Sequence, residues 1–328
     1  MNPVAERPSA LVLLATFNGE AFLREQIESI LAQEDVDLHL LARDDGSSDA
    51  TSALLAELAA SNQRIELLCD KRGRLGYAGN FSALLDAALL SEHRIFLLSD
   101  QDDLWQSSRA RRQIALLEST SGSGENRIPC LCHSDLSLMD SEGHAITASF
   151  MSTMQIRHEA PARQLPILLS QNFVTGCTIA MNRELLALAQ PFSANVRNHD
   201  HWLALCAACY GMILFDPLPL VAYRQHQHNA IGASGIAQKL LRHPAKSLGM
   251  ALEHLGDTRR MVLIAKELLS RNPACLKDDA KRLLQSVVEI LSSGRSGIHK
   301  MRALRGIGVE PQNTQRRLRW MLSWVLGR

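Results

Sequence analysis

The feature that most constrains this chain is a short apolar run that ends in three carboxylates. Residues 95–99 read Ile-Phe-Leu-Leu-Ser, and Asp100, Asp102 and Asp103 follow directly. A continuous apolar run of this length predicts a strand buried on both faces, which is typical of a parallel sheet covered by helices. In such an open sheet the ligand crevice lies beyond the carboxyl ends of the strands. We therefore expect residues 100–103 to border a ligand site.

The spacing of these carboxylates favours a metal. Neighbouring carboxylates repel one another unless a cation lies among them, and hard divalent cations prefer oxygen ligands. The Asp100-Gln-Asp102 pair therefore indicates a site for Mg²⁺ or Mn²⁺ against a diphosphate. Taken alone, the pattern is more typical of a solvated acidic turn that caps the next helix.

The rest of the chain alternates strands with helices before it becomes wholly helical. We predict parallel strands joined by helical crossovers in the first half, less regular strands after residue 126, and a domain that ends near residue 235. The fold class is thus α/β with a mixed, mainly parallel sheet over residues 1–235, followed by a helical extension over 236–328. The predicted strands are 11–15, 38–42, 65–69, 95–99, 130–133, 173–180, 213–215 and 220–223, and the clearest helices are 50–60, with Asp49 as N-cap, 80–90 and 109–117.

Charge is distributed unevenly along the chain. The net charge is +1, but residues 1–236 carry 17 Lys and Arg against 27 Asp and Glu, whereas residues 237–328 carry 18 against 7. A protein whose larger part is acidic is a poor binder of polyanions, so we expect no nucleic-acid partner. A basic tail that faces an anionic surface is the better interpretation.

The cysteines and the N-terminus favour a cytoplasmic protein. Seven cysteines, an odd number without a disulfide-like spacing, are typical of a reducing compartment. We interpret Cys206-x-x-Cys209 and Cys130-x-Cys132 as buried thiols in preference to zinc ligands. The apolar run at residues 11–15 is too short for a signal peptide, and no run approaches the roughly 20 apolar residues of a bilayer span.

Polar side chains follow three of the first four predicted strands. Thr16 follows the first strand, Asp44 and Asp45 the second, and Asp100 and Asp102 the fourth. A parallel sheet gathers these ends along one edge, where a nucleotide fits. The chain has neither a G-x-G-x-x-G dinucleotide fingerprint after its first strand nor a P-loop.

Seven segments in order resemble the family 2 glycosyltransferases of GT-A fold, and more narrowly their bacterial rhamnosyltransferase-like members. The resemblance covers roughly residues 9–235. The segments are Ala15-Thr-Phe-Asn-Gly19, Asp44-Asp-Gly-Ser-Ser-Asp-Ala-Thr51, Gly76-Tyr-Ala-Gly-Asn80, Ser99-Asp-Gln-Asp-Asp-Leu-Trp105, Asn172-Phe-Val-Thr-Gly-Cys-Thr178, His199-Asp-His-Trp202 and Tyr223-Arg-Gln-His-Gln-His-Asn-Ala-Ile-Gly232.

The resemblance implies transfer of a sugar from a nucleoside diphosphate donor with inversion at the anomeric carbon. Base and ribose contacts are expected from Thr16, Asp45 and the less certain Asp44. Asp100 is expected to orient the donor and Asp102 to bind the metal directly, whereas Asp103 either joins them or holds the following helix. Gly76 and Asn80 either shape the floor under the nucleotide or simply begin a helix.

An inverting displacement also needs a base on the acceptor hydroxyl. Asp200 is the candidate, although an Asp at a helix start is also a common N-cap; members of this family often carry Glu-Asp here, and His199 takes the place of the Glu. Arg224 is expected to bind the diphosphate, and His226 to be a further metal ligand. The sugar or acceptor pocket is assigned to Gly176, Thr178 and Trp202.

The last 18 residues form a basic amphipathic stretch. Trp320, Trp324 and Leu318 could lie at headgroup level while neighbouring arginines meet anionic lipid. Packing on the catalytic domain or a dimer interface explains the same pattern equally well.

The sequence thus predicts a cytoplasmic enzyme, peripheral at the inner membrane face, that is dependent on Mg²⁺ or Mn²⁺. Its expected donor is dTDP-L-rhamnose, from the subgroup resemblance, and its expected acceptor is a glycan or lipid-linked glycan of an O-antigen-like polysaccharide. A sugar nucleotidyltransferase is the enzymatic alternative, but residues 16–19 lack the basic residue expected in its first loop. A nucleotide-sugar-binding protein with an inactive site is the non-enzymatic one.

Overall fold

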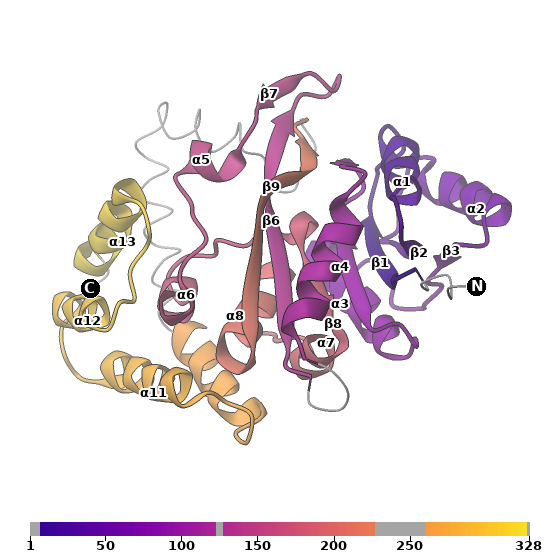
Figure 1. The fold of residues 1–328 in the computed structure, drawn as a ribbon. Helices are drawn as coiled ribbons and strands as arrows, with labels where there is room; N and C mark the ends of the chain where they lie inside the picture. Colours follow the sequence, from indigo (N-terminus) through magenta and orange to yellow (C-terminus); the bar gives the residue numbers. More distant parts are fainter. Residues whose placement is uncertain (1–6, 123–126, 227–259, 327–328) are drawn as a thin grey trace.

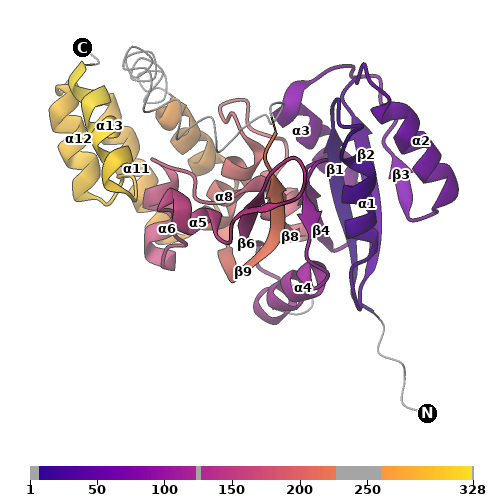
Figure 2. The same cartoon turned by 90° about the horizontal axis from the view of Figure 1, so that it is seen from above.

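The computed structural model describes residues 7–122, 127–226 and 260–326 (Figure 1). A single twisted sheet runs through the molecule, with helices on both of its faces (Figure 2). Its strand order is β3-β2-β1-β4-β8-β6-β9-β5, and β7 pairs with β6. The α/β class and the mixed sheet expected from the sequence are confirmed.

The first half of the sheet is wholly parallel. Its strands are β1 (Ser9–Thr16), β2 (Asp37–Asp44), β3 (Ile65–Leu67) and β4 (Ile95–Ser99). Every residue of β4 is buried, as its apolar run predicted. In register, Thr16 lies beside Asp44 and Leu14 beside Ser99, so the carboxyl ends of β1, β2 and β4 meet at one edge.

The second half is mixed and departs in two places from the sequence prediction. Residues 173–180 were expected to form a strand, but residues 173–175 are irregular, η1 (Gly176–Thr178) is a turn of 3-10 helix, and only β8 (Ala180–Asn182) is a strand. Segments 213–215 and 220–223 are one strand, β9 (Met212–Arg224), which runs parallel to β6 (Cys130–Met139). Shifts in the register between β6 and β9 accommodate Pro217 and Pro219 within this one strand.

Alternation along β1 explains why the sheet is covered on both faces. Leu11 and Leu13 pack into one apolar core, whereas Val12 and Leu14 pack into a second. Helices α3 (Gly76–Leu89), α7 (Arg183–Ala189) and α8 (His199–Tyr210) contribute to the first core. Helices α1 (Leu23–Leu31), α2 (Thr51–Ser61) and α4 (Arg109–Thr120) contribute to the second. The remaining elements before residue 227 are β5 (Leu104–Trp105), β7 (Ala145–Thr147), α5 (Phe150–Met154) and α6 (Pro161–Leu168).

The C-terminal extension is helical wherever it is described and packs against the first core. It contains a helix over residues 260–271, α11 (Asp278–Ser292), α12 (Gly297–Gly306) and α13 (Thr314–Leu326). Gln312 ties it to the catalytic half through Gln171 and Glu159. The predicted boundary near residue 235 lies outside the described residues. Within them, no helix is long and apolar enough to cross a membrane.

Candidate active site

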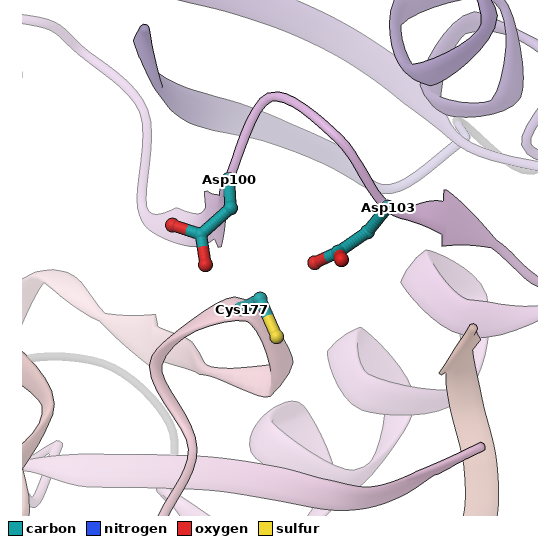
Figure 3. A group of neighbouring side chains, drawn as sticks. All are labelled: Asp100, Asp103 and Cys177. Carbon is teal, nitrogen blue, oxygen red and sulfur yellow. The ribbon is translucent and has the colours of Figure 1, made fainter. Parts of the chain in front are cut away.

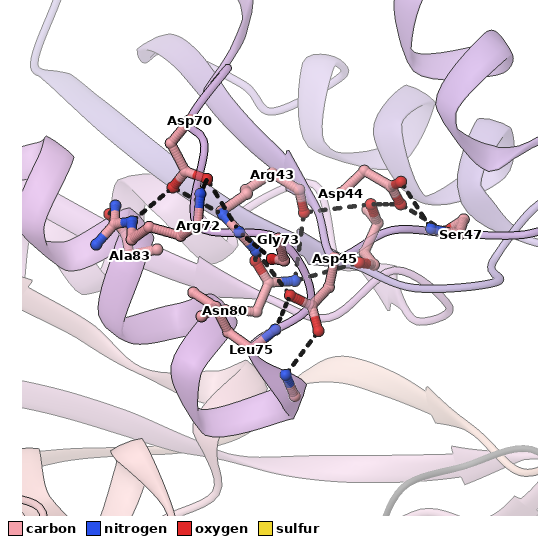
Figure 4. Close-up of polar contacts among 12 residues, drawn as sticks. Arg43, Asp44, Asp45, Ser47, Asp70, Arg72, Gly73, Leu75, Asn80 and Ala83 are labelled. Atoms are coloured by element: carbon pink, nitrogen blue, oxygen red, sulfur yellow. Dashed lines mark hydrogen bonds and ion pairs between the residues drawn. The ribbon is translucent and has the colours of Figure 1, made fainter.

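A buried arginine organises the loops behind the ends of β1 and β2 (Figure 4). Arg43 forms ion pairs with Asp45 at 2.8 Å and Asp70 at 3.1 Å, and it donates to the Asn80 amide oxygen at 3.1 Å. The Asn80 amide nitrogen donates to the carbonyl of Thr16 at 3.1 Å. One cation thus joins β2 to the start of α3 and to the end of β1.

The two acidic residues after β2 face different partners. Both Asp45 oxygens accept backbone N–H groups, from Leu75 and Gly76, each at 2.7 Å. Gly76 has a φ of 73°, a left-handed conformation that favours glycine, so this turn and the carboxylate fix the start of α3. Asp44 instead accepts from the Thr16 hydroxyl at 3.1 Å and from the backbone of Ser47 at 2.9 Å.

The loop after β4 carries the acidic side chains and is clamped by its middle residue. The Gln101 amide accepts from the backbone N–H of Phe17 at 2.7 Å and donates to the Phe17 carbonyl at 2.9 Å. A Cβ on Gly19 would lie 2.3 Å from the Gln101 side chain, so a larger residue there would displace the Gln101 amide from Phe17. Figure 3 shows Asp100 and Asp103 on the loop after β4, with the Asp103 carboxylate directed toward Asp100 and with Cys177 below both side chains.

Pairing of β5 with β9 brings the acidic loop and residues 224–226 together. Leu104 lies beside Ala222 in an antiparallel register, which places Arg224 behind the loop. Its backbone donates to Asp103 at 3.2 Å, and its guanidinium donates to the carbonyl of Asp102 at 3.0 Å and pairs with Glu25 at 2.6 Å. The structure therefore places Arg224 under the loop, with Glu25 as its carboxylate partner.

His226 and Asp102 lie in direct contact, with His226 Nε2 2.8 Å from Asp102 Oδ2. His226 also lies against Phe22, with ring centroids 4.8 Å apart. The remainder of the Tyr223-to-Gly232 segment, from residue 227 on, lies outside the described residues.

The electrostatics of the acidic loop suit a cation. Burial, together with repulsion from Asp102 and Asp200, raises the pKa of Asp100 to about 8. Burial, together with repulsion from Asp102 and Asp100, holds the pKa of Asp103 well above its usual value, and Asp103 Oδ2 is buried without a hydrogen-bond partner in the described structure. A positive charge among these groups would relieve both costs.

The donor set fits Mg²⁺ or Mn²⁺ better than zinc. Among the described residues, three potential ligand atoms lie within 4.8 Å of one another only at Asp100, Asp103 and Cys177. Burial raises the pKa of the Cys177 thiol well above its usual value, so the sulfur stays protonated and is a poor ligand. The carboxylate oxygens of Asp100 and Asp103 are left, and these suit a hard cation, whereas Asp102 and His226 are not members of this group. Buried, free Cys130, Cys132, Cys206 and Cys209 agree with their interpretation as packing residues.

Asp200 lies in the first turn of α8, close enough to the acidic loop to influence it. Burial raises the pKa of Asp200 to about 6, although hydrogen bonds from the His201 backbone, the Asn172 side chain and the Gly176 backbone oppose that rise. The His201 N–H donates to Asp200 Oδ1 at 2.6 Å. Asp102 and Asp200 both contribute to the raised pKa of Asp100. The three carboxyl groups are therefore electrostatically coupled.

His199 is a buried, neutral neighbour of Asp200. It stacks on Phe81 with centroids 3.9 Å apart, and burial lowers its pKa to about 3. A Cβ on Gly176 would come within 2.7 Å of His199 Nε2 and 3.5 Å of the Tyr77 hydroxyl. The absence of a side chain at Gly176 therefore allows His199 and Tyr77 to pack closely against its backbone.

The structure does not bring Trp202 or the Thr178 hydroxyl to this site. Trp202 is fully buried in the first core, where its indole N–H donates to the carbonyl of Ala189 at 2.8 Å. Thr178 is also fully buried, and its hydroxyl donates to the carbonyl of Thr175 at 2.7 Å. Trp202 is thus corrected to a packing residue, because α8 buries nearly its whole surface.

Sequence reasoning missed several residues that shape the site. They are Arg43, Gln101, Tyr77 and Asn172. Each stands within or beside a recognised segment, but only the long-range pairing of loops gives it a partner.

Comparison with known proteins places this geometry among glycosyl-transferring enzymes. Residues 11–186 match the family model described as Glycosyl transferase family 2. The chain is 27% identical over 230 residues to the dTDP-rhamnosyl transferase RfbG of Shigella flexneri, an alignment that covers 67% of this chain and 74% of that protein. It is 26% identical over 196 residues to the Escherichia coli UDP-Glc:alpha-D-GlcNAc-diphosphoundecaprenol beta-1,3-glucosyltransferase WfgD, covering 59% of this chain and 67% of that one.

Solved structures share the fold at low sequence identity. Residues 1–349 of TarS from S. aureus, in complex with UDP-GlcNAc, superpose with a TM-score of 0.56 at 13% identity, over 96% of this chain and 89% of that one. The mannosyltransferase PcManGT from Pyrobaculum calidifontis, in complex with GDP-Man and Mn²⁺, gives a TM-score of 0.52 at 17% identity, over 99% of this chain and 89% of that one.

Proposed function

The chain belongs to glycosyl transferase family 2, and from this premise we propose that it moves a sugar from a nucleoside diphosphate to an acceptor hydroxyl with inversion. The observation that supports the proposal is the electrostatic influence of Asp102 and Asp200 on Asp100, which follows β4 at the carboxyl edge of the sheet. In this proposal the loop of residues 100–103 would bind the metal, and Asp200, whose carboxyl has a raised pKa, would act on the acceptor.

Asp200 is the proposed catalytic base. Its carboxylate removes the proton of the acceptor hydroxyl while that oxygen bonds to the anomeric carbon, and the bond from this carbon to the diphosphate oxygen breaks. A pKa of about 6 leaves the group mostly ionised at neutral pH, yet more basic than an ordinary aspartate. The buried, neutral His199 beside it adds no competing charge.

Asp102 and His226 would hold the divalent ion, with Asp100 orienting the donor beside it. The bound ion would supply charge neutralisation for the departing diphosphate. Arg224 belongs to the donor site as a positioning group, since it fixes Asp102 and Asp103 from below.

Thr16, Asp44 and Asp45 are proposed to form the nucleoside side of the donor site, over a floor shaped by Gly76 and Asn80. Asp44, with its hydrogen bonds to Thr16 and Ser47, is the better direct contact for base or ribose. Asp45 acts through the turn that it fixes. Gly176 is proposed to border the sugar pocket, because its backbone hydrogen-bonds the carboxylate of Asp200, the proposed catalytic base.

The proposed donor is dTDP-L-rhamnose, and the proposed product is a cell-surface polysaccharide of the O-antigen type. Similarity to a dTDP-rhamnosyl transferase over two thirds of the chain supports the donor. Similarity to a glucosyltransferase named for a diphosphoundecaprenol-linked substrate supports a lipid-linked acceptor.

A donor assay tests this function. Purified protein with Mn²⁺ is incubated with dTDP-L-rhamnose, UDP-glucose or GDP-mannose, and release of the nucleoside diphosphate is measured. We expect release from one donor, with loss of at least 100-fold in Asp102→Asn and Asp200→Asn. Donor binding without release in the wild-type protein would favour an inactive binding protein instead.

We also propose that α13 touches the inner face of an anionic membrane. Leu318 and Leu322 are one helical turn apart and exposed at 55% and 54%, with Arg319 between them, whereas Trp320 is buried at 4%. The double substitution Leu318→Glu and Leu322→Glu should abolish sedimentation with phosphatidylglycerol vesicles while activity on a soluble acceptor is unchanged. Binding equal to wild type would remove this proposal.

A further inference from the structure

A cavity of about 240 Å³ lies where the catalytic half meets the C-terminal extension. The loop after α6 and the start of α8 form one wall. Residues of the 260–271 helix and of α13, including Trp320 and Trp324, form the other. Neither half encloses this space alone.

The cavity is adjacent to the proposed base. Asn198 and His201, on either side of Asp200 in the sequence, both line it. Asn172 also lines it and hydrogen-bonds the Asp200 carboxylate through its side chain. A hydroxyl that extends from this cavity toward Asp200 would approach the base from the side of α8, away from the nucleoside end of the sheet edge.

The lining combines two tryptophans with aliphatic side chains, polar side chains and the guanidinium groups of Arg197 and Arg260. Trp320 and Trp324 pack edge to face with ring centroids 6.0 Å apart, and they offer indole surface of the kind on which the C–H face of a pyranose can lie. Asn172, Asn198 and Ser170 offer amide and hydroxyl groups on the facing wall.

We propose that this cavity is the acceptor subsite and takes one pyranose ring of the acceptor glycan. Its volume is below the roughly 300–1,000 Å³ of drug-sized ligand pockets, which limits it to a single ring. The assignment of the cavity to the acceptor rests on the proposed function. Binding of a saccharide in the cavity does not depend on that function. The extension is accordingly part of the binding site as well as packing for the catalytic half.

Binding is tested without turnover. Saturation-transfer NMR on the full chain uses a mixture of methyl glycosides of glucose, galactose, N-acetylglucosamine and rhamnose. Ser323→Leu fills the cavity from α13, and Trp324→Ala removes an aromatic wall. Leu322→Ala, on the exposed face of the same helix, is the matched control. We expect ring-proton signals from at least one glycoside in wild type and control, and at least a fivefold loss in both cavity variants.

A second measurement separates the two proposals. Where the donor assay succeeds, the cavity variants should raise the acceptor KM at least tenfold and leave donor hydrolysis to water within twofold of wild type. Saccharide signals without any donor turnover would sink the proposed function and leave the site standing. Absence of signals in the wild-type protein, or equal signals in all variants whose circular dichroism matches wild type, would overturn the subsite.

Discussion

The Asp200 carboxyl combines two properties that a proton acceptor needs. Burial raises its pKa to about 6. Hydrogen bonds from His201, Asn172 and Gly176 stabilise the carboxylate anion and limit that rise. An ordinary exposed aspartate titrates about two pH units lower and is a weaker base. The N-cap alternative is not what the structure shows, because Asn198 occupies the cap position and Asp200 lies inside the first turn.

The pH dependence of turnover follows from this value. With saturating donor and metal, kcat should fall tenfold per pH unit below about pH 6, as Asp200 becomes protonated and can no longer accept the hydroxyl proton. Asp200→Glu should keep a measurable rate with a shifted profile, whereas Asp200→Asn should lose at least 100-fold at every pH. A rate that is flat from pH 5 to 8 in the wild-type protein would contradict the assignment.

Asp100 is expected to cost stability when no metal is bound. Its pKa is about 8 in the folded protein against 3.8 as the ordinary value, so between these values the folded state binds a proton that the unfolded state has lost. Stability should therefore fall as pH rises from about 4 to 8, by at most about 1.4 kcal/mol per pH unit from this group.

Asp100→Asn removes that titration. In metal-free buffer the variant should be more stable than wild type at pH 8, with a smaller advantage at pH 5, as measured by urea denaturation. Glu118→Gln, at an exposed position on α4, is the control and should follow wild type. Adding Mn²⁺ should raise the wild-type midpoint more than that of Asp100→Asn. If the stability gained in Asp100→Asn did not depend on pH, the pKa of Asp100 would not be raised by its surroundings.

The Arg43 network shows how whole elements are held around the donor site. Arg43 is almost completely buried between Asp45 and Asp70, so its loss would leave two carboxylates without their cation. Arg43→Met should cost about 3–5 kcal/mol of unfolding free energy, as breaking a buried pair does. Arg24→Met, whose side chain is 48% exposed in its pair with Glu57, should cost less than about 1 kcal/mol. Chemical denaturation measures both, and equal losses would contradict this reading of the network.

Local patterns were sufficient to predict the elements whose own residues determine them. The strands β1 and β4 carry continuous apolar runs, β2 is largely apolar apart from His39, and the helices between them have apolar periods, so their positions and the shared sheet edge were foreseen. The acidic residues at that edge were foreseen for the same reason.

Elements that depend on distant partners could not be predicted in this way. β8 has only three residues and exists because β4 and β6 flank it. β9 contains two prolines, which locally indicate a break, yet shifts in the register of β6 keep it continuous. Trp202 is aromatic and next to the base, but its burial follows from α8 being surrounded on nearly all sides, which its polar first turn conceals.

The catalytic half and the extension form one folded body in the described residues. Tyr210 donates to the carbonyl of Leu268, Lys277 donates to Gly211 at 3.1 Å, and Gln312 donates to Glu159 at 3.0 Å. These contacts are spread along the interface and are accompanied by a shared apolar core.

This continuity predicts one cooperative unfolding transition for the whole chain. Trp320 is 4% exposed within the shared core, so Trp320→Ala should cost about 3–5 kcal/mol and move the entire calorimetric transition. Leu318→Ala, two residues away at 55% exposure, should stay within about 0.5 kcal/mol of wild type. If the extension were an independent appendage, calorimetry would resolve two transitions and Trp320→Ala would move only one of them. A single transition that shifts as a unit requires that the helices beyond residue 260 stabilise the same core that supports Asp200.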